Sequence, residues 1–275
     1  LGGAVGMSSW IAHRETSERL LGNLRQSIQR ESGEVQLRLE TWIQGIQEDA
    51  RSVSQSPLVS EFLKRRNTAE EPRWRALLEN EFRAIFAGKA DYFQMRLLSA
   101  RGADDGREIV RLDRKGDSLE VTPRELLQSK AGRAYYQEAL AWPPGDVYLS
   151  EVNLNRDFGG ITTPHIPTIR AAVKIGNAES GQVMLIINAD LRPLFEEIRG
   201  LVSPSSEIRL IDSKGDYLLH PEADAIFASD LDPGRRPGGA PVATNAADKF
   251  AAKVGWQQES TSVHELAFVD RFDLG

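Results

Sequence analysis

Several side chains that could bind a small polar molecule gather between residues 128 and 190, at the ends of apolar segments. A helical segment at 130–139 carries one arginine and two tyrosines, and a strand at 147–150 places a tyrosine and a serine on one face. An arginine fork binds carboxylates, and tyrosine hydroxyls both donate and accept hydrogen bonds. This combination favours a ligand pocket. Its candidate residues are Arg133, Tyr135, Tyr136, Tyr148, Ser150, Arg170 and Asp190.

The helical spacing limits which of these residues can face one pocket. Tyr135 and Tyr136 are adjacent on a helix, so one should line the pocket while the other packs in the core. Arg133 could bind a ligand carboxylate, or it could form a surface ion pair with Glu125 or Glu138.

Arg170 interrupts the apolar strand 167–173 and therefore needs a buried partner. Asp190, which ends the strand 182–190, or a ligand could supply that partner. A plain structural ion pair is the alternative. Arg96 and Arg111 lie on neighbouring predicted strands and are further candidates.

Patterns typical of catalysis or metal binding are absent from the sequence. It contains no Gly-x-Ser-x-Gly elbow, no phosphate-binding glycine loop and no His-Glu-x-x-His. The chain has no cysteine, and its 4 histidines form no convincing metal-binding pattern. The sequence thus predicts neither an enzyme, nor a metal ion, nor a cofactor.

The composition is typical of a globular chain rather than a disordered one. Of the 275 residues, 40% are hydrophobic and 27% are charged, which suffices for one large domain or two ordinary ones. The formal net charge of -6 provides no domain-scale basic surface, so we expect no nucleic-acid partner.

The N-terminus suggests a membrane nearby. Residues 1–12 are uncharged but fall short of the roughly 20 residues that span a bilayer. They could be the outer end of a transmembrane helix, with Trp10 at the interface, or a flexible tail. We expect the chain to be part of a longer, membrane-anchored protein.

A long helix is predicted over residues 15–56. Its apolar residues include Val35, Leu39, Trp42 and Ile46, which recur at helical spacing. About 40 helical residues give a rod of about 60 Å, longer than most single-domain cores. Such a helix could be a dimer stalk, a spine along two domains, or a helix packed on its own sheet.

Shorter elements follow. The first are two helices and two strands, at 58–66, 73–86, 92–98 and 107–113. An Asp-x-Lys-Gly-Asp turn between strands occurs in 111–119 and again in 209–218, which indicates a duplicated architecture. Helices beside antiparallel strands predict an α+β fold.

The two halves of the post-stalk sequence meet near residue 201. The smaller second half is predicted to contain strands near 207–212, 216–220 and 263–270. We therefore expect three segments, namely 1–56, 57–200 and 201–275.

This order of elements resembles the double Cache sensor domains of bacterial transmembrane histidine kinases and diguanylate cyclases. The segments that carry the resemblance are Gln94–Arg96, Glu108–Arg111, Leu127–Lys130, Tyr148–Ser150, Asn153–Asn155 and Pro164–Arg170. The resemblance implies a long N-terminal helix followed by two PAS-like modules with antiparallel sheets. Residues 57–200 would be the membrane-distal, ligand-binding module, and 201–275 a membrane-proximal module truncated at its C-terminus.

Some Cache domains bind amino acids through an arginine, a tryptophan and a tyrosine on one helix, a Tyr-x-Asp strand and a final aspartate. The resemblance assigns these positions to Arg133, Tyr135, Tyr136, Tyr148 and Asp190. Two departures are Ser150, where that pattern has an acid, and Gln128, where it has a tyrosine. A ligand ammonium group would lose a counter-charge, which favours an anionic or neutral ligand.

The leading hypothesis is a small-molecule sensing domain on the periplasmic side of an inner-membrane receptor. Its ligand would be polar, such as a carboxylate or an amino acid, and the receptor would be a homodimer through the N-terminal helix. One alternative is a dimerisation and spacer module that binds no small molecule, with residues 35–46 forming the dimer contact. Another is the ectodomain of a chemotaxis receptor.

Overall fold

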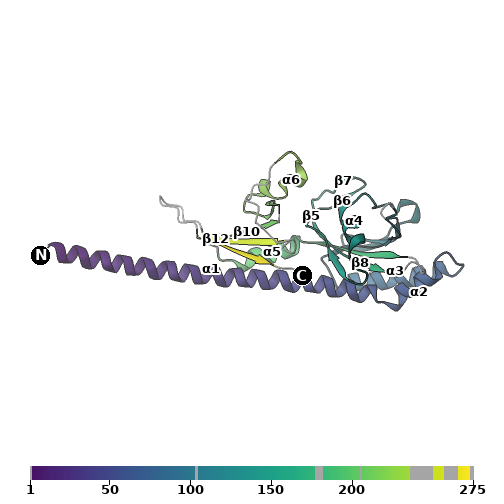
Figure 1. Ribbon diagram of the computed structural model, residues 1–275, viewed down its shortest axis with the longest axis horizontal. Helices are drawn as coiled ribbons and strands as arrows, with labels where there is room; N and C mark the ends of the chain where they lie inside the picture. Colours follow the sequence, from purple (N-terminus) through teal and green to yellow (C-terminus); the bar gives the residue numbers. More distant parts are fainter. Residues whose placement is uncertain are drawn as a thin grey trace. The chain divides into compact units, whose positions relative to one another are not determined.

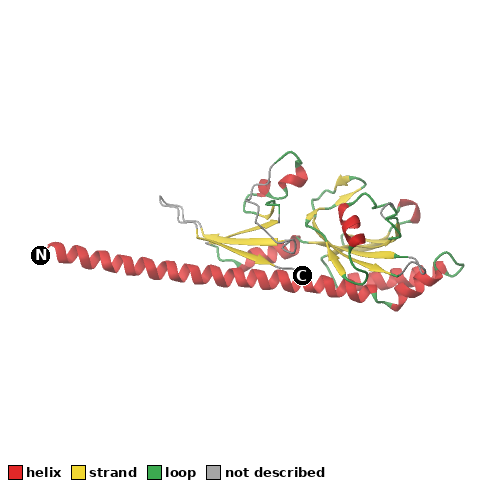
Figure 2. Ribbon diagram, viewed as in Figure 1, coloured by secondary structure: helices red, strands yellow, loops and turns green. Residues whose placement is uncertain are grey.

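The computed structural model describes residues 2–102, 105–176, 182–204, 206–212, 214–235, 250–256 and 266–272, with the backbone alone for residues 2–17, 250–256 and 266–272. The chain divides into two compact units. We call Thr41–Leu194 the central unit, and Leu1–Glu40 with Phe195–Gly275 the terminal unit. The first helix, α1 (Gly2–Ser54), supplies residues to both (Figure 1). Helices beside antiparallel strands make the fold α+β, as predicted (Figure 2).

The central unit is built on a 7-stranded antiparallel sheet of order β3-β2-β1-β9-β8-β4, in which β5 also pairs with β8. The strands are β1 (Tyr92–Ser99), β2 (Glu108–Lys115), β3 (Ser118–Val121), β4 (Val147–Leu149), β5 (Asn153–Leu154), β8 (Pro167–Ile175) and β9 (Val183–Asp190). The helices are α2 (Pro57–Arg65), α3 (Glu71–Ala87), the 3-10 turn η1 (Arg124–Leu126) and α4 (Ala134–Ala141). A separate 2-stranded hairpin joins β6 (Arg156–Asp157) to β7 (Gly160–Ile161).

The long helix α1 begins earlier than the sequence predicted and ends slightly sooner. In the described residues it extends back to Gly2, and the uncharged N-terminal segment contains no proline that would interrupt it. It stops at Ser54, and Ser56 Oγ then accepts a hydrogen bond from the Leu58 backbone N–H at 3.1 Å to cap α2. Within the described residues, no helix is both long and apolar enough to cross a bilayer.

The apolar side of α1 is buried by its own chain. Val35 is 0% exposed, Leu39 is 2% exposed and Ile46 is 1% exposed. In the central unit, Trp42 Nε1 donates a hydrogen bond to Asp91 at 2.8 Å. Val35, Leu39 and Ile46 are therefore covered, whereas Leu37 in the same stretch is 65% exposed. The dimer contact predicted at residues 35–46 would need these three buried side chains at a surface.

A turn replaces the first residues of the helix that the sequence placed at 130–139. The backbone N–H of Lys130 bonds to the Gly106 carbonyl at 2.8 Å, and Arg133 N–H bonds to the Lys130 carbonyl at 2.9 Å. Because the Lys130 backbone pairs with the neighbouring segment, α4 starts only at Ala134. This puts Arg133 at the helix N-cap rather than inside the helix.

The sheet face that contacts α4 changes character along the strands. At one end it is apolar, where Tyr136 and Ala139 of α4 pack with Leu98, Ala172, Met184 and Ile186. At the other end it is polar. The register explains this, because Arg170 lies opposite Asn188 and Ala172 lies opposite Ile186, and alternate residues of a strand share a face. The polar end is where a ligand site can form.

The terminal unit contains a second antiparallel sheet, of order β11-β10-β12-β13. Its elements are α5 (Arg192–Leu201), which begins in the central unit, β10 (Ser206–Asp212), β11 (Tyr217–Leu219), η2 (Ala223–Ala225), α6 (Ala228–Leu231), β12 (Phe250–Trp256) and β13 (Leu266–Phe272). β13 lies where a strand at 263–270 was predicted, although residues 263–265 are outside the described part of the chain.

The two predicted glycine turns are present. Gly116 links β2 to β3 with φ +59°, and Gly215 links β10 to β11 with φ +89°. Only glycine adopts such angles without steric cost. The repeat in the sequence therefore corresponds to one hairpin in each sheet.

Gly106 should tolerate alanine much less well than Gly116. Both have positive φ, at +46° and +59°, and alanine there costs about 1–2 kcal/mol from the left-handed backbone alone. A Cβ on Gly106 would also lie 2.5 Å from the Ala131 nitrogen, whereas nothing lies within 4 Å of one on Gly116. We expect Gly106→Ala to lower the free energy of unfolding by several kcal/mol more than Gly116→Ala. Urea unfolding of the two variants measures the difference, and equal losses would contradict the clash.

Candidate ligand-binding pocket

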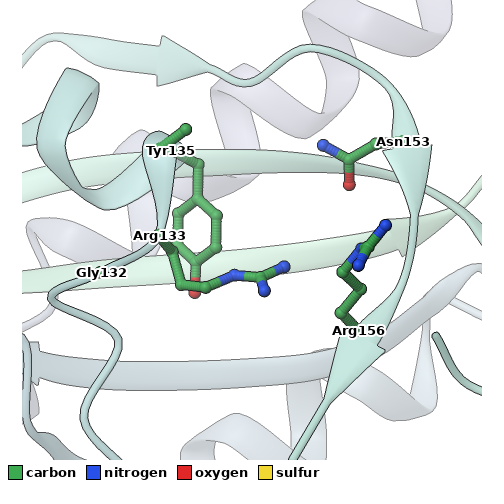
Figure 3. A pocket seen from close by; sticks show the side chains of 6 residues that line it. Gly132, Arg133, Tyr135, Asn153 and Arg156 are labelled. Carbon is green, nitrogen blue, oxygen red and sulfur yellow. The ribbon is translucent and has the colours of Figure 1, made fainter. Parts of the chain in front are cut away.

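A pocket of about 250 Å³ opens at the N-terminal end of α4 in the central unit (Figure 3). Its lining residues come from the turn before α4, from the first residues of that helix, and from the β5–β6 segment. They are Gly132, Arg133, Ala134, Tyr135, Asn153 and Arg156. The size suits a small molecule rather than a peptide or a large cofactor.

Two arginines face each other across this pocket. Figure 3 shows the Arg133 guanidinium extending from the start of α4 towards Arg156 on β6, with Asn153 beside it. Among the described residues, the lining contains no carboxylate. Its charged side chains are therefore both cationic, and the pocket favours an anion.

The Tyr135 ring lies against two buried guanidinium groups. The Arg170 guanidinium carbon is 4.9 Å from the ring centroid, and that of Arg96 is 5.7 Å away. Arg96 Nη1 also donates to the Tyr135 hydroxyl at 3.2 Å, and Arg170 Nη1 donates to Asn153 Oδ1 at 2.9 Å. Two of the lining residues, Tyr135 and Asn153, are thus held by arginines that are each only 2% exposed.

Glu108 is the central anion beneath this site. Its side chain is fully buried, and its Oε1 lies 3.4 Å from Arg96, 3.8 Å from Arg111 and 3.8 Å from Lys130. Its Oε2 accepts the backbone N–H of Gln128 at 3.0 Å. One carboxylate therefore neutralises part of three neighbouring cations. Burial, followed by the charge of Arg96, lowers the pKa of Lys130, against the opposing charge of Glu108.

Asp157 on β6 is a second anchor. Arg111 donates to it from Nη2 at 2.7 Å and from Nη1 at 3.3 Å, and Gln128 Nε2 donates at 3.1 Å. Lys130 Nζ lies 3.5 Å from Oδ1. Burial alone would raise the pKa of Asp157, but these donors, Arg111 first, outweigh it and hold that pKa well below its usual value.

Asp157 should contribute to the loss of stability of the domain at acidic pH. Its folded-state pKa lies below the ordinary value of 3.8, so its stabilisation is present above that value and is lost as the pH falls further. We expect Asp157→Asn to lose less of its melting temperature than the wild type on going from pH 5 to pH 3. Melting temperatures at stepped pH measure this, and parallel profiles would contradict the assignment.

The structure separates the two tyrosines of α4. Tyr135 lines the pocket, whereas the hydroxyl of Tyr136 accepts the Gly106 N–H at 2.9 Å inside the core. Tyr148 is also outside the lining, and its hydroxyl donates to the Glu138 carboxylate. Burial and this carboxylate raise the pKa of Tyr148.

Ser150 and Asp190 have protein partners beyond the pocket lining. Ser150 Oγ accepts the Arg170 backbone N–H at 3.0 Å and donates to the Glu151 carbonyl at 2.8 Å. The Asp190 carboxylate accepts hydrogen bonds from Arg192, from the backbone N–H and the Nε at 2.9 and 3.0 Å. Of the seven candidate residues, Arg133 and Tyr135 are thus in the lining, and Arg170 stacks on Tyr135 behind it.

Sequence reasoning did not single out Asn153 or Arg156 as pocket residues. Asn153 was part of a segment with family resemblance, but Arg156 carried no signal of its own. The available clue was the following Phe158-Gly159-Gly160, which predicts a tight turn, so that Arg156 begins a short hairpin. Among the described residues, no group of three or more His, Asp or Glu side chains could hold a metal ion.

Comparisons with known proteins agree on the fold. No curated protein matches the sequence. The domain of a sensory box/GGDEF family protein from Vibrio parahaemolyticus superposes with a TM-score of 0.59 at 18% identity, covering 90% of this chain and 97% of that one. The sensor domain of the V. cholerae histidine kinase DctB gives 0.54 at 12% identity, with 92% of both chains covered.

A third similar structure is the ligand-binding domain of the Pseudomonas aeruginosa amino acid chemoreceptor PctB in complex with L-Arg, with a TM-score of 0.51 at 15% identity, covering 92% of this chain and 96% of that one. The resemblance to Cache-type sensors is confirmed at the level of fold. The family model described as "Bacterial histidine kinase, sensor domain" matches residues 24–237. The chain therefore belongs to the family of bacterial histidine kinase sensor domains.

Proposed function

We propose that the pocket at the start of α4 is the ligand site of this sensor domain, and that its ligand is a small carboxylate. The observation that carries the proposal is the pair Arg133 and Arg156, facing each other across a lining without a carboxylate. A guanidinium binds a carboxylate through two parallel hydrogen bonds, so two such forks suit a dicarboxylate or a monocarboxylate shared between them.

Tyr135 and Asn153 complete the proposed contact set. The tyrosine offers a ring edge and a hydroxyl, and the asparagine offers an amide whose oxygen already accepts from Arg170 at 2.9 Å. Tyr136, Tyr148, Ser150 and Asp190 would then support the site through their own protein partners. An amino acid is a weaker candidate, because its ammonium group would meet two arginines and no counter-charge in the lining.

The receptor that we infer is anchored in the inner membrane, with this chain on the periplasmic side and a histidine kinase as its output. The family match supports the kinase over the cyclase. A homodimer through the N-terminal helix stays part of this proposal. The contact would have to use a face of α1 other than the one that carries the buried Val35, Leu39 and Ile46.

A direct connection from the pocket sheet to α1 supports a signalling role. Tyr92, the first residue of β1, donates its hydroxyl proton to Asp49 of α1 at 2.6 Å. Its neighbour Asp91 accepts from Trp42 of α1 and, through its carbonyl, from the Asp190 N–H of β9 at 2.8 Å. Because β1 and β9 also carry Arg96 and Asn188, a change at Tyr135 can reach α1 through two strands. A ligand shifts this balance only by its difference in affinity for the two states.

A thermal-shift screen of the purified domain tests the proposal. The panel comprises mono- and dicarboxylates, amino acids, primary amines and neutral sugars. We expect saturable stabilisation by carboxylates and none by amines, since ligand bound only to the folded state raises the melting temperature. Stabilisation by amines or sugars alone would contradict an anion site, and no stabilisation by any class would favour a spacer without a ligand.

A further inference from the structure

The β6–β7 hairpin carries two neighbouring residues with different contacts. Arg156 lines the pocket, and the next residue, Asp157, binds the polar end of the sheet. Successive residues of a strand point to opposite sides, so the two side chains leave β6 in different directions. The hairpin turns at Phe158 and Gly159, which have φ +47° and +89°.

The base of the hairpin is fixed by backbone hydrogen bonds, from Thr162 N–H to the Asn155 carbonyl at 2.9 Å and from Asn155 N–H to the Ile166 carbonyl at 2.8 Å. β6 and β7 pair only with each other, as a 2-stranded sheet apart from the main one. A hairpin of this size is unstable in isolation. Phe158 at its tip is 74% exposed and so adds little packing. The side-chain contacts of Asp157 with Arg111, Gln128 and Lys130 attach β6 to β2 and to the segment before α4.

The groups that hold Asp157 are themselves fixed. Arg111 is 6% exposed and is gripped from the other side by Asp113, whose oxygens lie 2.8 and 3.0 Å from its Nε. Lys130 is also 6% exposed, and its Nζ donates to Gln128 Oε1 at 2.8 Å. Arg111 and Lys130, each fixed by its own partners, thus bind a carboxylate from a short hairpin that lies outside the main sheet.

We propose that Asp157 is a positioning residue for the pocket: its ion pairs with Arg111 and Lys130 latch the β6–β7 hairpin so that Arg156 faces Arg133. The relevance of the latch to binding rests on the proposed anion site, but the latch itself does not. Release of the hairpin would remove one of the two guanidinium forks and open the pocket. The latch is thus the point at which ligand entry and hairpin movement are coupled.

The local electric field and the positioning of Arg156 predict opposite effects on anion affinity when Asp157 is removed. Removing a carboxylate makes the surroundings more positive, so the field alone would strengthen the binding of an anion. Loss of the Asp157 ion pairs would instead weaken it, because the hairpin that carries Arg156 would be held less firmly in front of Arg133. A weakened anion affinity in Asp157→Asn therefore indicates positioning rather than a field effect.

Asp113 provides the matched control. It pairs with the same arginine, Arg111, and is also largely buried, but it lies on β2 and does not touch the hairpin. Asp113→Asn removes the same charge from the same guanidinium and leaves the Asp157 contacts in place. Both variants are first compared by urea unfolding, so that any loss of global stability is known.

Two measurements without ligand test whether Asp157 holds the β6–β7 hairpin in position. Hydrogen exchange should accelerate about tenfold at the amides of residues 156–161 in Asp157→Asn but not in Asp113→Asn. Modification by p-hydroxyphenylglyoxal, followed by mass spectrometry, should become several-fold faster at Arg156 while Arg133 keeps its rate. Unchanged exchange and unchanged Arg156 reactivity in Asp157→Asn would overturn the proposal. If that variant does not fold, Gln128→Ala removes one latch hydrogen bond and should shift both readouts in the same direction.

Malonate, which carries two carboxylates, tests the link to binding. In the wild type it should protect both Arg133 and Arg156 from modification. Failure to protect either would count against the proposed anion site, while the exchange data would still decide the latch. Where malonate binds, Asp157→Asn should bind it about tenfold more weakly than Asp113→Asn does. Equal or tighter binding by Asp157→Asn would overturn the positioning role.

Discussion

Arg133→Ala should remove most of the stabilisation that a small carboxylate gives to this domain. The guanidinium points into the pocket, and within the described chain it makes no hydrogen bond or ion pair of its own (Figure 3). Hydrogen bonds to a charged group contribute about 1.5–3 kcal/mol. The affinity for a bound carboxylate should therefore fall about tenfold or more. Titration calorimetry with the best carboxylate of the screen measures this loss.

The same variant should leave the unliganded fold almost unchanged. Arg133 is half-exposed and caps α4 through its backbone rather than its side chain. Arg101→Ala is a suitable control, because Arg101 is also an arginine of the central unit but lies outside the lining, with a side chain that is 71% exposed. We expect that control to bind the carboxylate normally. Full binding by Arg133→Ala, or equal losses in both variants, would show that the ligand binds elsewhere.

Glu108→Gln should destabilise the domain strongly, by about 3–5 kcal/mol. The Glu108 side chain is 0% exposed and lies within 3.8 Å of Arg96, Arg111 and Lys130. The amide of glutamine keeps the shape but removes the charge, so three buried cations lose a shared counter-ion. For a chain of this size the melting temperature should fall on the order of 10 °C.

Glu120→Gln is the matched control for that experiment. Glu120 also pairs with a lysine, Lys115 at 2.7 Å, but its side chain is 51% exposed. Exposed pairs contribute only about 0–1 kcal/mol, since water and salt screen them. We expect a change of melting temperature close to zero. A small fall in melting temperature for Glu108→Gln, similar to that of the control, would mean that other groups neutralise the three cations.

The polar end of the sheet connects these two predictions. Arg96 contacts Glu108 at 3.4 Å and the Tyr135 hydroxyl at 3.2 Å, so a stabilising network and the pocket share one side chain. Buried ionic groups cost desolvation energy that apolar residues would avoid. Buried ionic groups beneath a pocket therefore favour a site that is shaped for one class of ligand. Glu108→Gln should accordingly weaken ligand binding as well as stability.

The sequence by itself determined the elements of this protein and the order in which they occur. Apolar residues spaced three and four apart predicted the long helix, and alternation predicted β1 and β2. Continuous apolar runs predicted β8 and β9, and the two Lys-Gly-Asp turns predicted the paired hairpins. These signals are local, because they depend on which face of one element is apolar. The candidates Arg133 and Tyr135 also came from local pattern, and the structure places both in the lining.

Tertiary structure decided which polar residues meet. Arg156 begins a 2-residue strand, and nothing in its sequence neighbourhood shows that it faces Arg133, 23 positions earlier. Asp190 was assigned to the pocket, but in the structure its carboxylate pairs with nearby Arg192. The sequence cannot rank such partners, because the energy of a charge pair depends on its distance and burial, and both arise only when strands far apart in the chain are brought together.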